Sequence, residues 1–196
     1  MKKLTLIAAL FTFCLLHSNA HGQQFDAAFG LGTLSSGAPT TSNGLFYPSD
    51  RGGVYPSISA DFLVTHRVGI EGEFAWRASQ ALYGGAEPYR PIFYAINAIW
   101  APKLGKSFTA ELLAGIGGED LRFYNGVNYN PLAGYTNYTS SNHFMGDIGG
   151  GIRAYFWHNA FIRPEVRLYL IHNNAEFSSG YAERYGASIG YSFGGR

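Results

Sequence analysis

The chain has little cysteine and little charge. Its one cysteine, Cys14, lies inside an N-terminal apolar run. The chain after residue 20 therefore forms no disulfide and has neither a thiolate nucleophile nor a cysteine-ligated metal. Charged residues make up only 14% of 196 residues and the formal net charge is +1, which does not favour a nucleic-acid partner. No later segment offers the roughly 20 consecutive apolar residues of a transmembrane helix.

The first 20 residues predict a secretory signal peptide. Two lysines near the start precede an apolar run from Leu4 to Leu16, and Ser18-Asn19-Ala20 supplies small residues for cleavage. The run is too short to span a bilayer as a helix, which takes about 20 residues. We therefore predict a signal peptide over residues 1–20 and a single domain over residues 21–196.

Glycine and aromatic residues are abundant: the chain has 26 glycines and 16% aromatic residues, a composition that favours many short strands. The last segment, 183–193, shows the pattern most clearly. Its odd-numbered positions from Tyr185 to Phe193 are apolar or aromatic, whereas the even-numbered positions from Arg184 to Ser192 are small, polar or charged. A period of two is the signature of a strand with two different faces.

Seven earlier segments repeat this alternation, each about the 9 to 11 residues of a tilted membrane strand. Long connections follow the first, third, fifth and seventh strands, and short ones follow the second, fourth and sixth. We therefore predict an all-β fold, an eight-stranded antiparallel up-and-down transmembrane β-barrel with short periplasmic turns and long extracellular loops. The predicted strands span residues 24–34, 54–65, 68–78, 91–101, 107–118, 143–156, 160–171 and 183–193.

A secreted soluble barrel would bury the apolar face instead. Three features favour lipid on that face. Its aromatic residues concentrate near strand ends, as in interfacial girdles. The polar face is rich in glycine, which suits a narrow interior. After the signal, lysine occurs only at Lys103 and Lys106, in one predicted turn.

Acids and arginines then alternate on neighbouring strands of the inward face. We predict an arginine–carboxylate network that fills the lumen, because unpaired charges are costly in a tube too narrow for bulk water. A gated ion path is the alternative. The predicted network consists of Asp26, Asp61, Glu71, Glu73, Arg77, Glu111, Asp147, Arg153, Arg163, Glu165, Arg167 and Arg184.

Over residues 21–196 the pattern resembles the OmpA-like transmembrane barrel and the wider family of small outer-membrane β-barrel proteins. The resemblance rests on the signal, the eight alternating strands and the aromatic ending Tyr185–Phe193. It implies the outer membrane of a Gram-negative bacterium, with lipopolysaccharide and the barrel-assembly machinery as partners. It also implies that Tyr191 and Phe193 form the assembly signal. The family's roles run from envelope integrity through adhesion to porin-like passage of small solutes, and we expect no catalysis, cofactor or metal.

An enzyme is the contrasting hypothesis, because the family includes lipid A deacylases with a His-x-Ser-Asn-Ala motif. The nearest stretch here starts at His172, which continues a lipid-facing row to the outer rim. Position 174, where the motif's serine nucleophile should stand, is Asn174, which has no nucleophilic hydroxyl.

The longest predicted loop, 119–142, is rich in tyrosine, asparagine and glycine. Tyrosine-rich polar loops form rigid contact surfaces in binding proteins, so we predict that this loop recognises any surface ligand. A loop that only covers the barrel is the alternative. The candidate recognition residues are Tyr124, Tyr129, Tyr135 and Tyr138.

Overall fold

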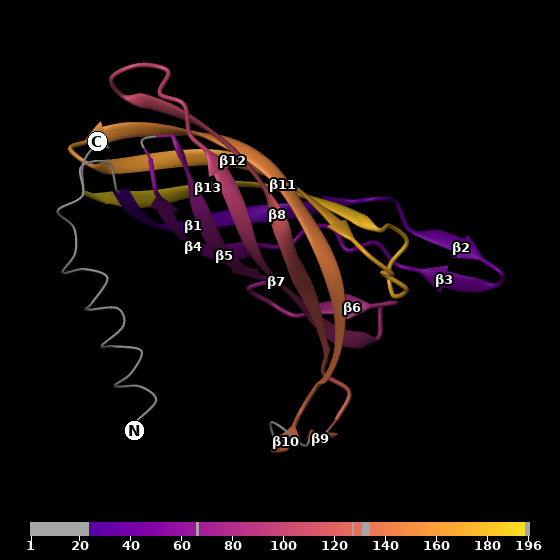
Figure 1. The fold of residues 1–196 in the computed structure, drawn as a ribbon. Coiled ribbons are helices and arrows are strands. Elements are labelled where there is room, and N and C mark those ends of the chain that lie inside the picture. The colour runs from indigo at the N-terminus through magenta and orange to yellow at the C-terminus, as the bar shows by residue number, and fades with distance from the viewer. Residues whose placement is uncertain (1–23, 66, 127, 131–133, 195–196) are drawn as a thin grey trace.

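The computed structural model describes residues 24–65, 67–126, 128–130 and 134–194, so the predicted signal peptide lies outside the described residues. Eight long antiparallel strands close into a barrel (Figure 1). Each pairs with its neighbours in chain order, and β13 closes the barrel on β1, with Phe193 opposite Phe25. The barrel strands are β1 (Gln24–Ser36), β4 (Tyr55–Leu63), β5 (Val68–Trp76), β7 (Glu87–Trp100), β8 (Phe108–Phe123), β11 (Thr139–Trp157), β12 (Ala160–Ile171) and β13 (Tyr181–Gly194).

The apolar face of the barrel points outward and the charged face points inward. In β13 the outward Ile189 is 57% exposed, whereas the inward Arg184 is 1% exposed. This is the reverse of a soluble protein, in which arginine is almost never fully buried. It is the arrangement of a barrel that faces lipid, and it confirms the predicted membrane orientation.

Aromatic side chains form two outward-facing bands. Trp100, Phe108, Phe156 and Phe193 are exposed near the short turns, and Tyr94, Phe144 and Tyr185 are exposed near the long loops. Such bands lie at the two membrane–water interfaces, where an aromatic ring contacts both lipid and headgroups. Among the described residues, no helix is long and apolar enough to cross a membrane.

The short periplasmic turns span residues 64–67, 101–107 and 158–159. The extracellular connections are loop 1 (37–54), loop 2 (77–86), loop 3 (124–138) and loop 4 (172–180). These loops carry short strands that the sequence did not predict: β2 (Thr40–Ser42), β3 (Leu45–Tyr47), β6 (Ala81–Tyr83), β9 (Asn128–Asn130) and β10 (Gly134–Thr136). The β2–β3 and β9–β10 hairpins project beyond the barrel wall (Figure 1).

Three barrel strands extend four or five residues further than predicted at the extracellular end, and β1 and β13 each extend two. β7 begins at Glu87, β8 ends at Phe123 and β11 begins at Thr139. Phe123 pairs with both Tyr89 and Thr139, so the backbone ladder continues beyond the aromatic band. The prediction was wrong here because it treated Pro88 and the nearby glycines as loop signals, whereas Pro88 lies in β7 opposite Leu82 of β6.

Candidate functional site

Four arginines occupy the middle of the lumen, and each contacts carboxylates on other strands. They are Arg153 of β11, Arg163 and Arg167 of β12, and Arg184 of β13, each at most 1% exposed. Their planar guanidinium groups carry several donors in a fixed fork, which suits them to join more than one carboxylate.

Arg153 lies in the layer closest to the periplasmic turns. Its guanidinium donates to Glu111 Oε2 at 2.6 Å and to Asp61 Oδ2 at 2.6 Å, and it also bonds Asp26. These carboxylates come from β8, β4 and β1, so one side chain links four strands around the barrel.

Arg163 and Arg167 fill the next layers. Arg163 Nη1 lies 2.7 Å from Glu111 and 3.2 Å from Glu71. Arg167 Nη1 lies 2.9 Å from Glu71 and 3.0 Å from Asp147. Glu71 of β5 therefore bridges both arginines.

Arg184 and Asn97 complete the network. Arg184 Nη2 lies 2.7 Å from Glu165 and also bonds Glu73. The Asn97 amide donates to Glu71 at 3.0 Å and to Asp147 at 2.8 Å, which brings in β7. All eight barrel strands thus contribute at least one side chain to a connected set of bonds.

Glycines on the inward face leave room for the arginine stems. A Cβ on Gly149 would lie 3.0 Å from Cγ of Arg167, and one on Gly151 would lie 3.3 Å from Cγ of Arg163. The same Cβ atoms would lie still closer to the backbone carbonyl oxygens of Val166 (2.8 Å) and Pro164 (2.7 Å), so a larger residue would displace both the arginine stems and the β12 backbone. The many glycines that the sequence places on the polar face therefore leave the space in which the lumen network forms.

Apolar side chains close the network at both ends. On the extracellular side the rings of Phe93 and Tyr169 stack with centroids 4.8 Å apart, in a buried cluster with Tyr55 and Met145. On the periplasmic side Leu63, Ile99 and Ala101 form a smaller buried cluster. The charged layers are therefore separated from water along the barrel axis.

The structure brings together all of the predicted network residues except Arg77. Arg77 Nη1 lies 3.7 Å from Asp50 of loop 1, at the extracellular mouth. It directly follows β5, at the start of loop 2, because the inward row of side chains continues beyond the last strand residue into the loop. Sequence reasoning did not identify Asn97 as a member, although its inward parity was visible.

Loop 4 covers the extracellular mouth. Phe177 is buried against the rings of Tyr83, Tyr89 and Phe123, at centroid distances of 5.4 to 5.6 Å from the first two. The Ser178 amide donates to the Pro48 carbonyl of loop 1 at 2.9 Å. Loop 4 thus contacts loop 1, β6 of loop 2 and the extended ends of β7 and β8; we call this assembly the extracellular cap.

Ser141, His143 and Glu176 meet at the edge of the cap. Ser141 Oγ lies 3.2 Å from His143 Nε2, and Glu176 Oε2 lies 3.1 Å from the same nitrogen. The Ser141 hydroxyl also donates to Glu176 Oε1. A serine hydrolase triad instead places the acid on Nδ1 and the serine on Nε2. The geometry is therefore that of a contact holding loop 4 to β11.

Asp50 is a buried acid under the cap. It is 3% exposed and accepts a hydrogen bond from the Tyr89 hydroxyl at 2.9 Å. Burial raises the pKa of Asp50 to about 6, although the Tyr89 hydrogen bond and the charge of Arg77 act to lower it.

The remaining predicted site residues lie apart from the lumen. Tyr124 and Tyr138 are half-buried in loop 3 with rings 6.1 Å apart. Tyr129 and Tyr135 are cross-strand partners in the β9–β10 hairpin. On β13, the rings of Tyr191 and Phe193 meet at 4.9 Å on the lipid-facing side.

His172 is exposed at the start of loop 4, and the Asn174 amide bonds the Ser179 carbonyl. In the part of the chain that the structure describes, no group of three or more histidine, cysteine or acidic side chains is arranged to hold a metal ion.

No protein-family model and no curated protein matches the chain. Its fold is similar to several solved structures. Neisserial surface protein A has a TM-score of 0.60 at 11% identity, covering 88% of this chain and 97% of that one. Ail of Yersinia pestis, in complex with the heparin analogue sucrose octasulfate, has a TM-score of 0.56 at 13% identity, with coverage of 88% and 99%. The N-terminal β-barrel domain of Pseudomonas aeruginosa OprF has a TM-score of 0.55 at 14% identity, with coverage of 88% and 98%.

These likenesses, together with the outward apolar belt and the buried charges, define an eight-stranded outer-membrane β-barrel protein. At such identities they establish the fold only. The role of this chain has to be inferred from its own residues.

Proposed function

We propose that the protein is a non-enzymatic outer-membrane barrel whose closed lumen supports the cell envelope and presents the extracellular loops for surface interactions. The observation that carries the proposal is the lumen network. Its four arginines, together with Asn97 of β7, join side chains from all eight strands, and apolar clusters close it at both ends. An eight-stranded barrel is only about wide enough to be filled by side chains.

Planar-bilayer recording tests whether the lumen is closed. We expect the wild-type protein to give no stepwise conductance. Arg163→Ser removes the side chain that reaches from β12 to Glu111 and Glu71 across the lumen, and we expect it to open small steps. The lumen holds seven carboxylates and four arginines, so these steps should be cation-selective. Arg51→Ser, in exposed loop 1, is the matched control. Wild-type steps as large as those of Arg163→Ser would contradict the proposal.

The proposal that the protein is not an enzyme can be tested separately. Ser141 bonds Glu176 directly, and serine and acid share one imidazole nitrogen, which does not suit proton relay. We therefore expect no labelling by a serine-reactive fluorophosphonate and no acyl-chain release from lipid A. Labelling that disappears in Ser141→Ala would overturn the non-enzymatic assignment.

The extracellular surface favours neutral or polar ligands over polyanions. No lysine occurs in any extracellular loop. Six acids lie at the extracellular end of the barrel: Asp50, Glu87, Glu119, Asp120, Glu176 and Glu183. A heparin analogue is bound by Ail, but the extracellular loops of this chain contain only two arginines, Arg51 and Arg77, and no lysine. Loop 3, with Tyr138 beneath the Arg122 guanidinium at 4.7 Å, is the candidate contact surface. Deleting residues 127–137 should abolish binding to surface ligands while leaving the barrel folded.

A further inference from the structure

The periplasmic rim carries positive charge without any acid. Arg67 lies in the 64–67 turn, and Lys103 and Lys106 lie in the 101–107 turn. Seven of the 13 acidic residues lie inside the lumen and the other six lie at the extracellular end, so none lies in a periplasmic turn. The two lysines are the only ones after residue 20. The charge of the barrel is therefore strongly asymmetric along its axis.

The 101–107 turn has a fixed backbone. The Leu104 amide donates to the Phe108 carbonyl at 2.9 Å, and the Ala110 amide donates to the Pro102 carbonyl at 3.0 Å. Lys103 forms an isolated antiparallel bridge with Thr109. The Ala101 amide donates to the Arg67 carbonyl at 2.7 Å, which holds the neighbouring turn alongside. The three cations therefore belong to two adjoining turns.

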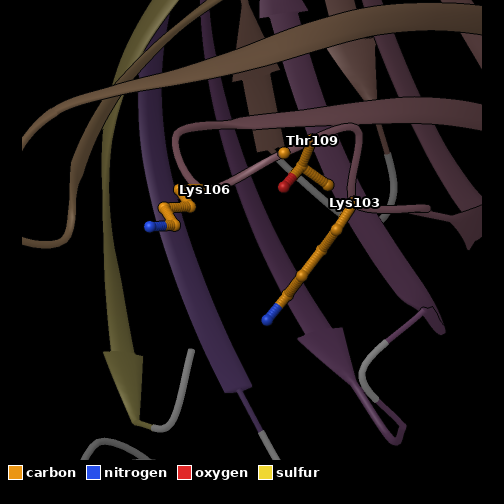
Figure 2. A pocket seen from close by; sticks show the side chains of 4 residues that line it. Lys103, Lys106 and Thr109 are labelled. Atoms are coloured by element: carbon orange, nitrogen blue, oxygen red, sulfur yellow. The ribbon is translucent and has the colours of Figure 1, made fainter.

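The two lysines line a pocket. Its volume is about 330 Å³, and Lys103, Gly105, Lys106 and Thr109 surround it. Figure 2 shows both lysine side chains extending from the turn toward the same side, with the Thr109 side chain close to the base of Lys103. Two ammonium groups and a hydroxyl provide donors for an oxyanion.

Exposed apolar side chains belong to the same turn or to the strand ends next to it. Leu104, between the two lysines, is 64% exposed, and Trp100 and Phe108 of the inner aromatic band flank the turn. If Leu104 faced water, its apolar side chain would contribute no burial free energy. At a lipid–headgroup boundary, however, Leu104 contacts acyl chains while lysine stems extend their ammonium groups to the phosphate level.

We propose that the periplasmic rim formed by Arg67, Lys103 and Lys106 binds the phosphate groups of anionic phospholipids in the leaflet that faces the periplasm. The aromatic band sets the depth of the turns at the headgroup layer of that leaflet. The negative charge of the phosphate groups complements the three cations of these turns. The lysines act as point charges that attract anionic lipid and not a particular headgroup shape.

Quenching by brominated lipids tests the proposal. The folded protein is reconstituted with Trp76→Phe and Trp157→Phe, so that Trp100, the last residue of β7 before the 101–107 turn, is the remaining reporter. Its quenching is measured in vesicles that contain brominated phosphatidylglycerol or brominated phosphatidylcholine. We expect a preference for phosphatidylglycerol of up to about fivefold per lysine, which high salt reduces. Lys103→Gln combined with Lys106→Gln should reduce the preference to the part that Arg67 supplies, and the double substitution to arginine should retain the full preference.

Arg51→Gln removes one exposed cation at the extracellular end and should leave the preference unchanged. Because both lysines are exposed, we expect all variants to fold, which the change in gel mobility on boiling checks. Equal quenching of the wild type by the two lipids would overturn the proposal, as would a preference that the double glutamine variant leaves undiminished. Competition by inorganic phosphate, compared with chloride at equal ionic strength, identifies a site for soluble phosphate and would also overturn it.

Discussion

Replacing Asp50 by asparagine should reduce the pH dependence with which the extracellular cap docks. Asp50 lies in loop 1 and is buried beneath the cap, where it accepts a hydrogen bond from Tyr89. Asparagine keeps an acceptor oxygen for Tyr89 and cannot ionise. The substitution therefore removes a charge from a buried position with little change in shape.

The pKa gives the size of the effect. Burial raises the pKa of Asp50 from 3.8 to about 6. When loop 1 undocks, Asp50 enters water and its pKa returns to the ordinary value. Below about pH 4 the group is protonated in both states. Between pH 4 and 6 the undocked state loses the proton while the docked state retains it, so docking weakens as the pH rises. Above pH 6 the full difference of about 3 kcal/mol has been lost, roughly a hundredfold in the docking equilibrium.

Hydrogen exchange measures this equilibrium. The Gly52 amide bonds the Leu34 carbonyl at 2.7 Å, and the Ser178 amide bonds the Pro48 carbonyl at 2.9 Å. Both bonds break if loop 1 leaves the cap. After correction for intrinsic exchange, protection of these amides should fall between pH 4 and 6 in the wild type. It should fall less in Asp50→Asn and exceed the wild-type value above pH 6.

Glu119 of β8 is another carboxylate close to Asp50, so it adds to the wild-type curve. The difference between wild type and Asp50→Asn isolates the contribution of Asp50. Glu87→Gln, which removes an acid of β7 that is less buried, serves as the control and should leave the curve unchanged. An Asp50→Asn protein whose protection follows the wild-type curve would refute the reasoning.

Three further outcomes are expected. Arg167→Leu leaves Glu71, Glu73 and Asp147 without this partner, so urea unfolding in detergent should show a loss of about 3–5 kcal/mol, whereas Arg51→Leu should show almost none. Phe177→Ala empties the centre of the cap's aromatic cluster, so a protease should cut loop 4 faster while the boiling-dependent gel shift persists. Phe193→Ala should slow assembly by the barrel-assembly machinery more than Ile189→Ala, an equally outward substitution on β13, and equal rates would contradict a special role for the terminal aromatic residue.

The barrel could be predicted from the sequence because one physical rule repeats eight times. Each strand has an apolar row that meets lipid and a polar row that meets the lumen, and a shift of one residue would exchange them. The rule therefore predicted β12 (Ala160–Ile171) with the correct bounds and placed Arg163, Glu165 and Arg167 on one face.

The extracellular end could not be predicted in this way. Beyond the aromatic band no lipid imposes alternation, and the backbone ladder there is maintained by contacts between loops. The Asp50–Arg77 pair joins residues from loop 1 and loop 2, and Phe177 meets side chains from β6, β7 and β8. Parity along a single strand assigns Arg77 to the inward row but gives no information about a partner that comes from a folded loop.

The lumen and the cap differ in how they depend on charge. In the lumen each arginine is held by carboxylates from several strands, so the loss of one bond leaves others in place; Arg167 still contacts Asp147 and Glu165 without Glu71. In the cap Asp50 accepts a hydrogen bond from Tyr89 and pairs with one cation, Arg77, at 3.7 Å. A single protonation therefore has a large effect on the cap and a smaller one on the barrel. Changes in pH at the cell surface should thus rearrange the loops while the transmembrane wall stays closed.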